Sequence, residues 1–214
     1  MPGEAGRFAH SAVTRLFGTV FAVPKGLFLL PGRERAERKG GRAMATMYLM
    51  VGISGAGKTT WAKTRLAGAE YIGSDGIRME LFGKELTLKG YHRVHRIMNQ
   101  RMRAALEQGR DVVVDSVHLS RRARRRVLRA VPEGVRCVAV WIDTGVMQAI
   151  RNDACRQRHV PFFAIALMQP RLVEPKQEEG FHEIRRISWQ ERVESDTREN
   201  GPKYEKNENP AKIT

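Results

Sequence analysis

The sequence predicts an α/β fold in which helices cover both faces of a mostly parallel central sheet. Apolar runs of strand length alternate with helical segments from Met47 onward, and Val112-Val113-Val114 is apolar throughout. Continuous apolar runs are typical of parallel strands buried on both faces. Strand–helix alternation is typical of a sheet wrapped by helices. The chain of 214 residues, 42% of them hydrophobic, is long enough for one such domain.

Each element has its own signal along the chain. Strands are predicted where apolar residues run together, and helices where they recur at i, i+3 and i+4. Gly109 ends one predicted helix and Pro161 begins another. The predicted strands are Met47–Val51, Glu70–Gly73, Asp111–Asp115, Val135–Ile142 and Ile184–Val193. The predicted helices are Lys58–Leu66, 92–108, Arg121–Val131, Thr144–Cys155 and Pro161–Met168.

Residues 1–43 do not share this pattern. Their apolar patches are broken by charged residues, glycines and Pro24, so no run approaches the roughly 18 apolar residues of a membrane span. Two hypotheses stay open: translation starts at Met44 or Met47, or the segment is a disordered basic arm used for targeting. The folded domain is predicted at residues 44–194, followed by a disordered polar tail at residues 195–214.

A glycine-rich stretch follows the first strand and carries the most specific signal in the chain. It reads Gly52-Ile53-Ser54-Gly55-Ala56-Gly57-Lys58-Thr59-Thr60, which has the G-x-x-x-x-G-K-T spacing of a phosphate-binding loop. Glycines permit the tight turn that directs backbone N–H groups toward a phosphate. Lys58 is expected to reach the outer phosphates, and Thr59 to hold Mg²⁺. We therefore predict a P-loop NTPase three-layer sandwich that binds ATP or another nucleoside triphosphate.

Two aspartates follow neighbouring strands of the predicted sheet. Asp75 lies just after Glu70–Gly73, and Asp115 ends the strand that contains Val112-Val113-Val114. Ligands of open α/β sheets bind at the carboxyl ends of the strands, so we expect both carboxylates beside the phosphate loop. Asp75 is predicted to be the general base on an attacking hydroxyl, with an N-cap as its alternative role. Asp115 is predicted to hold Mg²⁺ or its water, with a structural role as the alternative.

Three stretches together resemble a known family. The loop Gly52–Ala62, the element Ser74-Asp75-Gly76-Ile77-Arg78 and the strand end Val114-Asp115-Ser116-Val117-His118-Leu119 are similar to segments of the 5′-hydroxyl polynucleotide kinases of phage and bacterial nucleic-acid repair. The resemblance implies that Asp75 is the base on the 5′-hydroxyl and that Arg78 contacts a phosphate of the acceptor. His118 stands where that family more often has Asn. No acceptor role passes to His118, which we expect on the surface.

A later segment, Arg151-Asn152-Asp153-Ala154-Cys155-Arg156-Gln157-Arg158-His159-Val160-Pro161, resembles the arginine-bearing lid of these kinases. The resemblance implies that lid arginines clamp the donor phosphates and stabilise charge in the transition state. The family's Arg-Asn-x-x-Arg pattern would place its second arginine at Cys155, whereas Arg156 comes one residue later. Counting back from Pro161 favours Arg156 and then Arg158 as catalytic. Counting forward favours Arg151 as a nucleotide contact.

The charge of the chain indicates an affinity for polyanions. The formal net charge is +15, which favours partners such as nucleic acid. Arg122, Arg125, Arg126 and Arg129 form a helical stripe that is suited to a phosphate backbone, although a solvated face is the commoner explanation. Cys137 is predicted in the core, and no Cys/His cluster has metal-ligand spacing. We expect a reduced, cytoplasmic setting and no membrane partner.

Three functions compete. The leading hypothesis is an ATP- and Mg²⁺-dependent phosphotransferase that moves the γ-phosphoryl group to a hydroxyl, as the resemblance to polynucleotide kinase implies. A small metabolite or a nucleoside as acceptor would need the same chemistry. A nucleotide-binding protein or NTPase without an acceptor is the third hypothesis. The acceptor, the preference between ATP and GTP, and the oligomeric state stay open.

Overall fold

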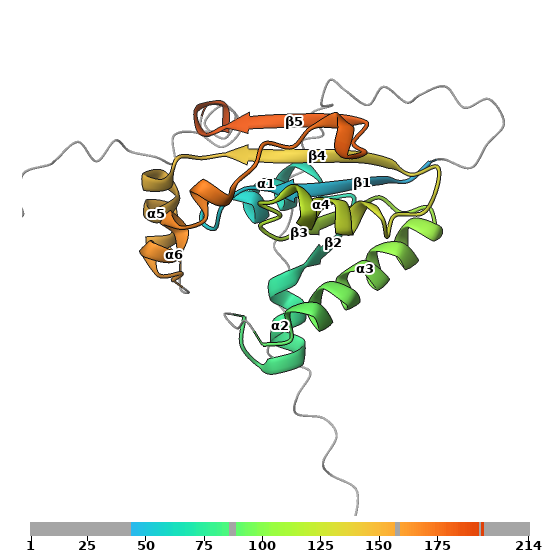
Figure 1. Ribbon diagram of the computed structural model, residues 1–214, viewed down its shortest axis with the longest axis horizontal. Helices are drawn as coiled ribbons and strands as arrows, with labels where there is room; N and C mark the ends of the chain where they lie inside the picture. Colours follow the sequence, from blue (N-terminus) through green and yellow to red (C-terminus); the bar gives the residue numbers. More distant parts are fainter. Residues whose placement is uncertain (1–43, 86–88, 157–158, 193, 195–214) are drawn as a thin grey trace, which may run out of the picture. The chain divides into compact units, whose positions relative to one another are not determined.

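Five parallel strands form the centre of the fold (Figure 1). The computed structural model describes residues 44–85, 89–156, 159–192 and 194. The strands follow the order β2-β3-β1-β4-β5, and every neighbouring pair is parallel. They are β1 (Thr46–Val51), β2 (Glu70–Gly73), β3 (Val112–Asp115), β4 (Arg136–Asp143) and β5 (Glu183–Ser188). The predicted α/β class is therefore confirmed, with a sheet that is parallel throughout the described residues.

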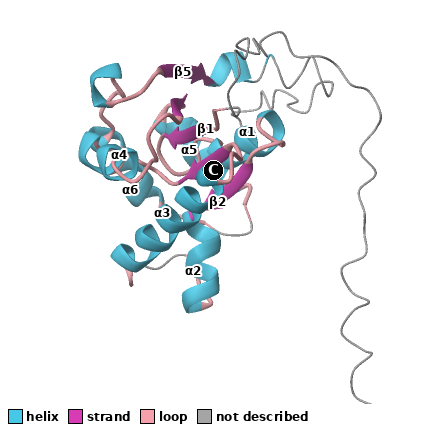
Figure 2. Cartoon of the chain, turned by 90° about the vertical axis from the view of Figure 1, so that its right-hand side faces the viewer, coloured by secondary structure: helices cyan, strands magenta, loops and turns pink. Residues whose placement is uncertain are grey.

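Helices cover both faces of this sheet (Figure 2). One face carries α2 (Ser74–Phe82), α3 (Tyr91–Glu107) and α4 (Arg121–Leu128). The other carries α1 (Lys58–Arg65), α5 (Val146–Ala154) and α6 (Phe162–Ala166). Two single-turn 3-10 helices, η1 (Gln169–Arg171) and η2 (Gln177–Glu179), lie between α6 and β5. The result is the three-layer arrangement that the sequence predicts.

The central strands are mostly apolar because they contribute to both cores. Leu49 of β1 packs in the cluster on the α3 side, whereas the next residue, Met50, packs in the cluster on the α1 side. Val112 and Val113 of β3 divide in the same way. Successive side chains of a strand point to opposite faces, so a sheet covered on both sides needs apolar residues at every position.

The predicted end of the last strand at Val193 is wrong, because β5 ends at Ser188 and residues 189–192 are helical. The backbone N–H of Ser188 donates to the carboxylate of Glu191 at 2.8 Å, and the N–H of Glu191 donates to the Ser188 hydroxyl at 3.2 Å. These reciprocal bonds form a capping box, which starts a helix. The Ser-x-x-Glu pattern that signals it is present in the sequence.

A buried ion pair fastens η2 to α4. Arg124 of α4 donates from Nε and Nη2 to the two carboxylate oxygens of Glu179, at 2.8 and 2.6 Å. Both side chains have no solvent exposure. The guanidinium also donates to four backbone carbonyls, those of His118, Leu119, Val173 and Glu174. Arg124 therefore belongs to the core, unlike the arginines of the predicted stripe that surround it in sequence.

The predictions about Cys137, the two ends of the chain and membrane spans have different outcomes. Cys137 is buried as predicted, and burial raises the pKa of its thiol to about 11. The predicted extension at residues 1–43 and the tail at residues 195–214 lie outside the described residues, so the domain bounds at 44 and 194 stay predictions. In the part of the chain that the structure describes, no helix is both long enough and apolar enough to cross a membrane.

Candidate active site

The phosphate-binding loop joins β1 to α1 and packs closely against the backbone of α5. Gly55 has a φ of 76°, and a Cβ added there would lie 2.1 Å from the carbonyl oxygen of Ala149 on α5. Only glycine fits this position. Gly57, with a φ of 94°, directly precedes α1, whose first N–H groups and positive helix end face the loop. The predicted stretch Gly52–Thr60 thus has the turn and helix start that an anion site requires.

Lys58 lies at the centre of the predicted catalytic residues. Its Nζ donates to the carbonyl oxygen of Ile53 at 2.7 Å, which folds the side chain back over the loop. Burial is the main cause that lowers the pKa of this ammonium group. The Asp115 carboxylate opposes that effect, the Arg156 guanidinium adds to it, and the Asp75 carboxylate opposes it again. Asp115, Arg156 and Asp75 are therefore the charged groups that act on the pKa of Lys58.

Thr59, in the first turn of α1, meets Asp115 at the end of β3, the strand beside β1 in the sheet. The Thr59 hydroxyl donates to Oδ2 of Asp115 at 2.6 Å, and the Tyr71 hydroxyl donates to the same oxygen at 2.5 Å. No group of three His, Cys, Asp or Glu residues gathers around a metal position in the described chain. Mg²⁺ needs few protein ligands, however, because phosphates and water complete its oxygen shell. The oxygens of Thr59 and Asp115 fit that requirement.

Tyr71 is a member of this site that the sequence patterns did not reveal. It lies on β2 two residues before Gly73, so both face the same side of the sheet, and a Cβ on Gly73 would lie 2.9 Å from the Tyr71 ring. Burial and then the adjacent Asp115 carboxylate raise the pKa of the Tyr71 hydroxyl above its usual range. Tyr71 therefore stays protonated and keeps the Asp115 carboxylate oriented.

Asp75 lies in the first turn of α2, immediately after β2. The N-cap of this helix is Gly73, so the alternative role of Asp75 as the N-cap is wrong. Arg78 donates from Nη1 to Oδ1 of Asp75 at 2.8 Å and to the hydroxyl of Ser74 at 3.0 Å. One turn of helix thus places the expected base and the expected acceptor contact side by side.

The arginines of the predicted lid have different positions. Arg156 follows α5, with Nη1 3.9 Å from Oδ1 of Asp153. Together with burial, its positive charge helps to lower the pKa of Lys58. Arg151 is an exposed residue of α5. Its neighbour Asn152 contacts the phosphate loop, because its amide nitrogen donates to the carbonyl oxygen of Gly55 at 3.0 Å. Arg158 lies outside the described residues. An arginine-bearing lid thus stays a prediction, in which Arg156 is the best placed member.

Two residues from distant parts of the chain hold the loop at Ala56. The hydroxyl of Thr144, just after β4, donates to the Ala56 carbonyl oxygen at 3.1 Å, and Nη1 of Arg192 donates to the same oxygen at 2.8 Å. The Arg192 guanidinium also lies against Gly57, where a Cβ would collide with it, and stacks on the Trp189 ring at 4.5 Å. Neither residue was singled out from the sequence.

The expectation that His118 lies on the surface is wrong, because its residue exposure is only 2%. Gly52 donates its N–H to the carbonyl oxygen of Val117 at 3.2 Å, which draws the segment after β3 under the loop. His118 follows with a φ of 41°, and its Nδ1 donates to the carbonyl oxygen of Met50 at 2.8 Å. Burial lowers the pKa of this imidazole to about 4. His118 therefore supports the end of β1 as a neutral side chain.

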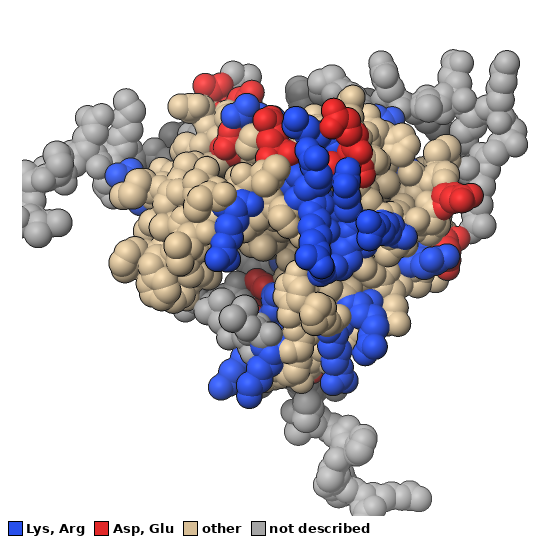
Figure 3. Space-filling view, in the orientation of Figure 1, with Lys and Arg blue, Asp and Glu red and all other residues tan. Residues whose placement is uncertain are grey.

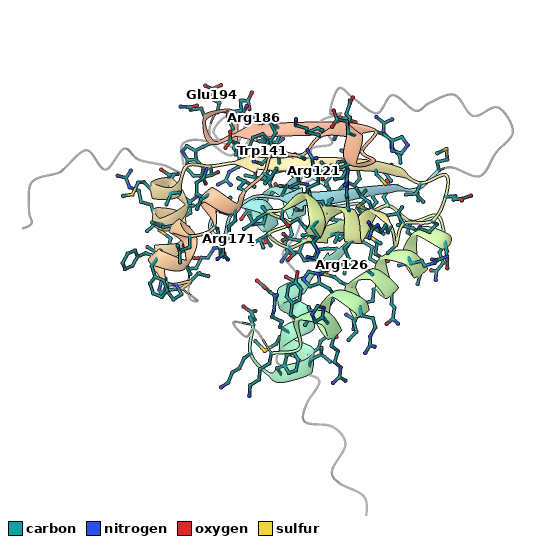
Figure 4. The ribbon with its side chains drawn as sticks, in the orientation of Figure 1. Arg121, Arg126, Trp141, Arg171, Arg186 and Glu194 are labelled. Carbon is teal, nitrogen blue, oxygen red and sulfur yellow. The ribbon has the colours of Figure 1, made fainter. Side chains whose placement is uncertain are left out.

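A hollow of about 720 Å³ opens beyond the ends of β4 and β5. Its lining includes Gly145 and Gln148 at the start of α5 and Trp189 after β5. On β5 beside it, the Arg186 guanidinium stacks over the Trp141 ring at 4.6 Å (Figure 4). Because Trp189 also contacts Arg192, this hollow adjoins the phosphate loop.

No curated protein sequence matches the chain. The sequence profile of the AAA domain family matches residues 47–175, more than half of the 214 residues. The chain belongs to this AAA domain family. The match covers the phosphate loop, both aspartates and the segment of the predicted lid.

Solved structures show the same fold for this AAA domain. A chain of the Pnkp1/Rnl/Hen1 RNA repair complex is similar with a TM-score of 0.56 and 18% identity, over 63% of this chain and 46% of that one. A sugar kinase from Janibacter sp. HTCC2649 is similar with a TM-score of 0.52 and 20% identity, over 67% of this chain and 85% of that one. This chain thus spans less than half of the RNA repair protein. Likeness at such identities shows a P-loop kinase-like fold.

Proposed function

We propose that this chain is a phosphotransferase that moves the γ-phosphoryl group of ATP to a hydroxyl, with the 5′-hydroxyl of a polynucleotide as the acceptor. The observation that carries the proposal is that Asp75, just after β2, and Lys58, at the end of the loop after β1, lie at the same edge of the parallel sheet. Burial lowers the pKa of Lys58 and the Asp75 carboxylate opposes that effect, which supports one site for the residue expected to hold donor phosphates and the carboxylate expected to take the acceptor proton. A site that only binds ATP would not require a carboxylate at the position of Asp75.

The reaction follows from the roles of these side chains. The acceptor oxygen forms a bond to the γ-phosphorus while the bond from that phosphorus to the bridging oxygen of ADP breaks. The proton of the acceptor hydroxyl passes to the carboxylate of Asp75. Lys58, Arg156 and the N–H groups at the start of α1 stabilise the charge on the phosphate oxygens. Mg²⁺ held by Thr59 and Asp115 would supply further charge neutralisation.

The choice of a polynucleotide rests on three supports. The Asp75–Arg78 element resembles that of the polynucleotide kinases, and the fold resembles a chain of an RNA repair complex. Arg78 bonds to Asp75, so a phosphate beside the acceptor hydroxyl would lie within reach of the same guanidinium. The net charge of +15 favours a polyanionic acceptor.

The hollow lined by Trp189 is suited to the nucleoside of the donor.

The test measures transfer of radiolabelled γ-phosphate from ATP to 5′-hydroxyl oligonucleotides and, in parallel, to a panel of sugars and nucleosides. Asp75→Asn should lower the rate of transfer by roughly 10²–10⁴-fold, the usual contribution of a general base, and leave ATP binding intact. Lys58→Ala should abolish transfer and weaken ATP binding. Glu80→Gln, which changes an exposed carboxylate on the same helix, should have no effect and serves as the matched control.

The outcomes separate the competing functions. Transfer to a sugar or nucleoside with none to oligonucleotides would replace the polynucleotide by a small acceptor. Phosphate release from ATP that no acceptor stimulates and that Asp75→Asn leaves unchanged would identify an NTPase.

A further inference from the structure

A groove of about 350 Å³ separates α3 from α4 on the face of the sheet that also carries α2. We call it the α3–α4 groove and define it by His92, His95, Arg96, Asn99 and Arg103 from α3 and Arg126 from α4. None of the described residues that line it is acidic. Figure 3 shows Lys and Arg side chains gathered over α4 and along α3, and Figure 4 labels Arg126 where the two helices approach.

The positive charge of this groove is largely uncompensated. Arg103 pairs with Glu107 at 2.8 Å, as exposed arginines on helices commonly do. Arg96 and Arg126 have no such carboxylate partner within the described part of the chain. One of these two arginines also acts on a neighbouring side chain, because burial, then Arg78, then Arg126 lower the pKa of His95 to about 4. The groove therefore presents cationic guanidinium groups beside a neutral imidazole.

The groove also offers a hydrogen-bond acceptor that lacks a donor. The side-chain oxygen of Asn99 is buried, and no group of the described residues donates to it. A ligand for this groove thus needs negative charge for Arg96 and Arg126, and it can donate an N–H or O–H to Asn99 once a rotation of that side chain exposes the buried amide oxygen. A nucleotide unit has both, because its phosphodiester is anionic and its base or sugar carries donors.

The groove is connected to the candidate base through a short series of residues. Asp75 bonds to Arg78, and α2 packs on α3 in the same core cluster. Arg78 affects the pKa of His95, and His95 lines the groove together with Arg126. An acceptor whose terminal hydroxyl lies at Asp75 would therefore have its next phosphate at Arg78 and the following ones at the groove.

We propose that the α3–α4 groove is a phosphodiester subsite that holds a single-stranded polynucleotide acceptor downstream of the hydroxyl at Asp75. The proposal rests on the function proposed above and adds where the rest of the acceptor binds. A groove of this volume accommodates a nucleotide unit of a single strand, whereas a duplex would rest on the outer surface. Of the four stripe arginines, the structure assigns Arg126 to this subsite; Arg122, Arg125 and Arg129 are exposed and do not line it.

The test compares two double variants that remove the same charge. Arg96→Gln/Arg126→Gln empties the groove of its unpaired guanidinium groups. Arg125→Gln/Arg129→Gln removes exposed arginines of α4 and is the matched control. The acceptors are a nucleoside 3′-phosphate and 5′-hydroxyl DNA single strands of increasing length. Thermal unfolding of each variant verifies that the fold is retained.

In the wild-type protein and in the control, KM for the acceptor should fall as the strand lengthens. The groove variant should lose most of this gain, at least about tenfold for the longest strand, while kcat changes little. Each phosphate contact to a single strand contributes about 0.7 to the slope of log K against log salt concentration. The loss of two such contacts should make the slope for strand binding less steep by about 1.4.

The proposal and the function beneath it fail in different ways. If strands are phosphorylated and the groove variant keeps the length dependence and salt slope of the control, the groove is not the subsite, and the kinase function stands. If the wild-type protein phosphorylates no strand but does phosphorylate a small alcohol, the polynucleotide acceptor itself is refuted, and the subsite with it.

Discussion

Replacement of Arg124 by methionine should destabilise the folded protein more than most single substitutions would. Methionine keeps an unbranched, flexible side chain, although a shorter one, and removes the charge and all of the donors. The change leaves the buried carboxylate of Glu179 with only the more distant Arg121, 3.9 Å away, as an ion-pair partner. It also deprives four backbone carbonyls of the guanidinium that bonds to them. If Arg124 were a surface residue, its replacement would change the free energy of unfolding far less than the loss of a buried ion pair does.

The magnitude follows from the burial of both partners. Breaking a buried ion pair by removal of one partner costs about 3–5 kcal/mol, because the remaining charge is uncompensated. Each net hydrogen bond lost adds roughly 1 kcal/mol, so Arg124→Met should fall at or above the upper end of that range. Glu179→Gln should cost less, since the guanidinium keeps its four carbonyl partners and the amide still accepts one hydrogen bond. For a domain of this size, a loss of 4 kcal/mol lowers Tm by roughly 8–16 °C.

The assay is urea unfolding followed by far-UV circular dichroism, with the wild-type protein, both single variants and Arg124→Met/Glu179→Leu. The double variant should be more stable than Arg124→Met alone, because it removes a buried carboxylate whose remaining ion-pair partner, Arg121, is 3.9 Å away. Arg122→Met, an exposed position on the same helix, controls for the composition change. An Arg124→Met variant within 1 kcal/mol of the wild type, at an unchanged m value, would refute the assignment of this pair to the core.

Two further predictions concern the phosphate loop and its support. Arg192→Gln should weaken ATP binding by roughly tenfold or more, with a smaller effect on kcat, because the lost charged hydrogen bond to Ala56 is worth about 1.5–3 kcal/mol. Arg185→Gln is the control. An unchanged Kd for ATP in Arg192→Gln would contradict the role of Arg192 as a support of the phosphate loop. The folded-state pKa of His118 lies near 4, below its ordinary value of 6.5, so the unfolded chain binds the proton first as the pH falls. The neutral His118 side chain therefore contributes about 3 kcal/mol to the free energy of unfolding above pH 6.5, and this contribution is lost as the pH falls from 6.5 to 4. Asn tolerates the positive φ, so His118→Asn should show a shallower loss of unfolding free energy over this range; an identical pH profile would count against it.

The sheet and the nucleotide side of the site were predictable because their signals are local. Val112–Val114 identifies a buried parallel strand without knowledge of its neighbours, and Gly52–Thr59 combines a turn, a cation and a hydroxyl within one short loop. The rule that ligands lie at the carboxyl ends of parallel strands then placed Asp75 and Asp115 beside the loop. For Asp115 the hydrogen bond from the Thr59 hydroxyl at 2.6 Å agrees with that placement.

The burial of polar residues was harder to predict because it depends on contacts between distant segments. Nothing near Arg124 in the sequence distinguishes it from Arg122 or Arg125, and only the docking of Glu179 from η2 selects it for the core. His118 has the same difficulty. Its side chain turns inward because the loop that carries it bonds to Gly52, and a histidine in a polar segment carries no sign of that bond.

The support of the loop at Ala56 suggests how such residues can be found in related sequences. In a parallel sheet every strand delivers the residue that follows it to the same edge. Thr144 follows β4 and Arg192 lies one helical turn beyond β5, and both donate to the Ala56 carbonyl although they are distant from it in sequence. The segments after the two strands on that side of β1 are therefore the places to search for donors. In this chain the capping box at Ser188 starts the helix that turns Arg192 toward the loop, so a local signal in the sequence determines a contact that no local motif describes.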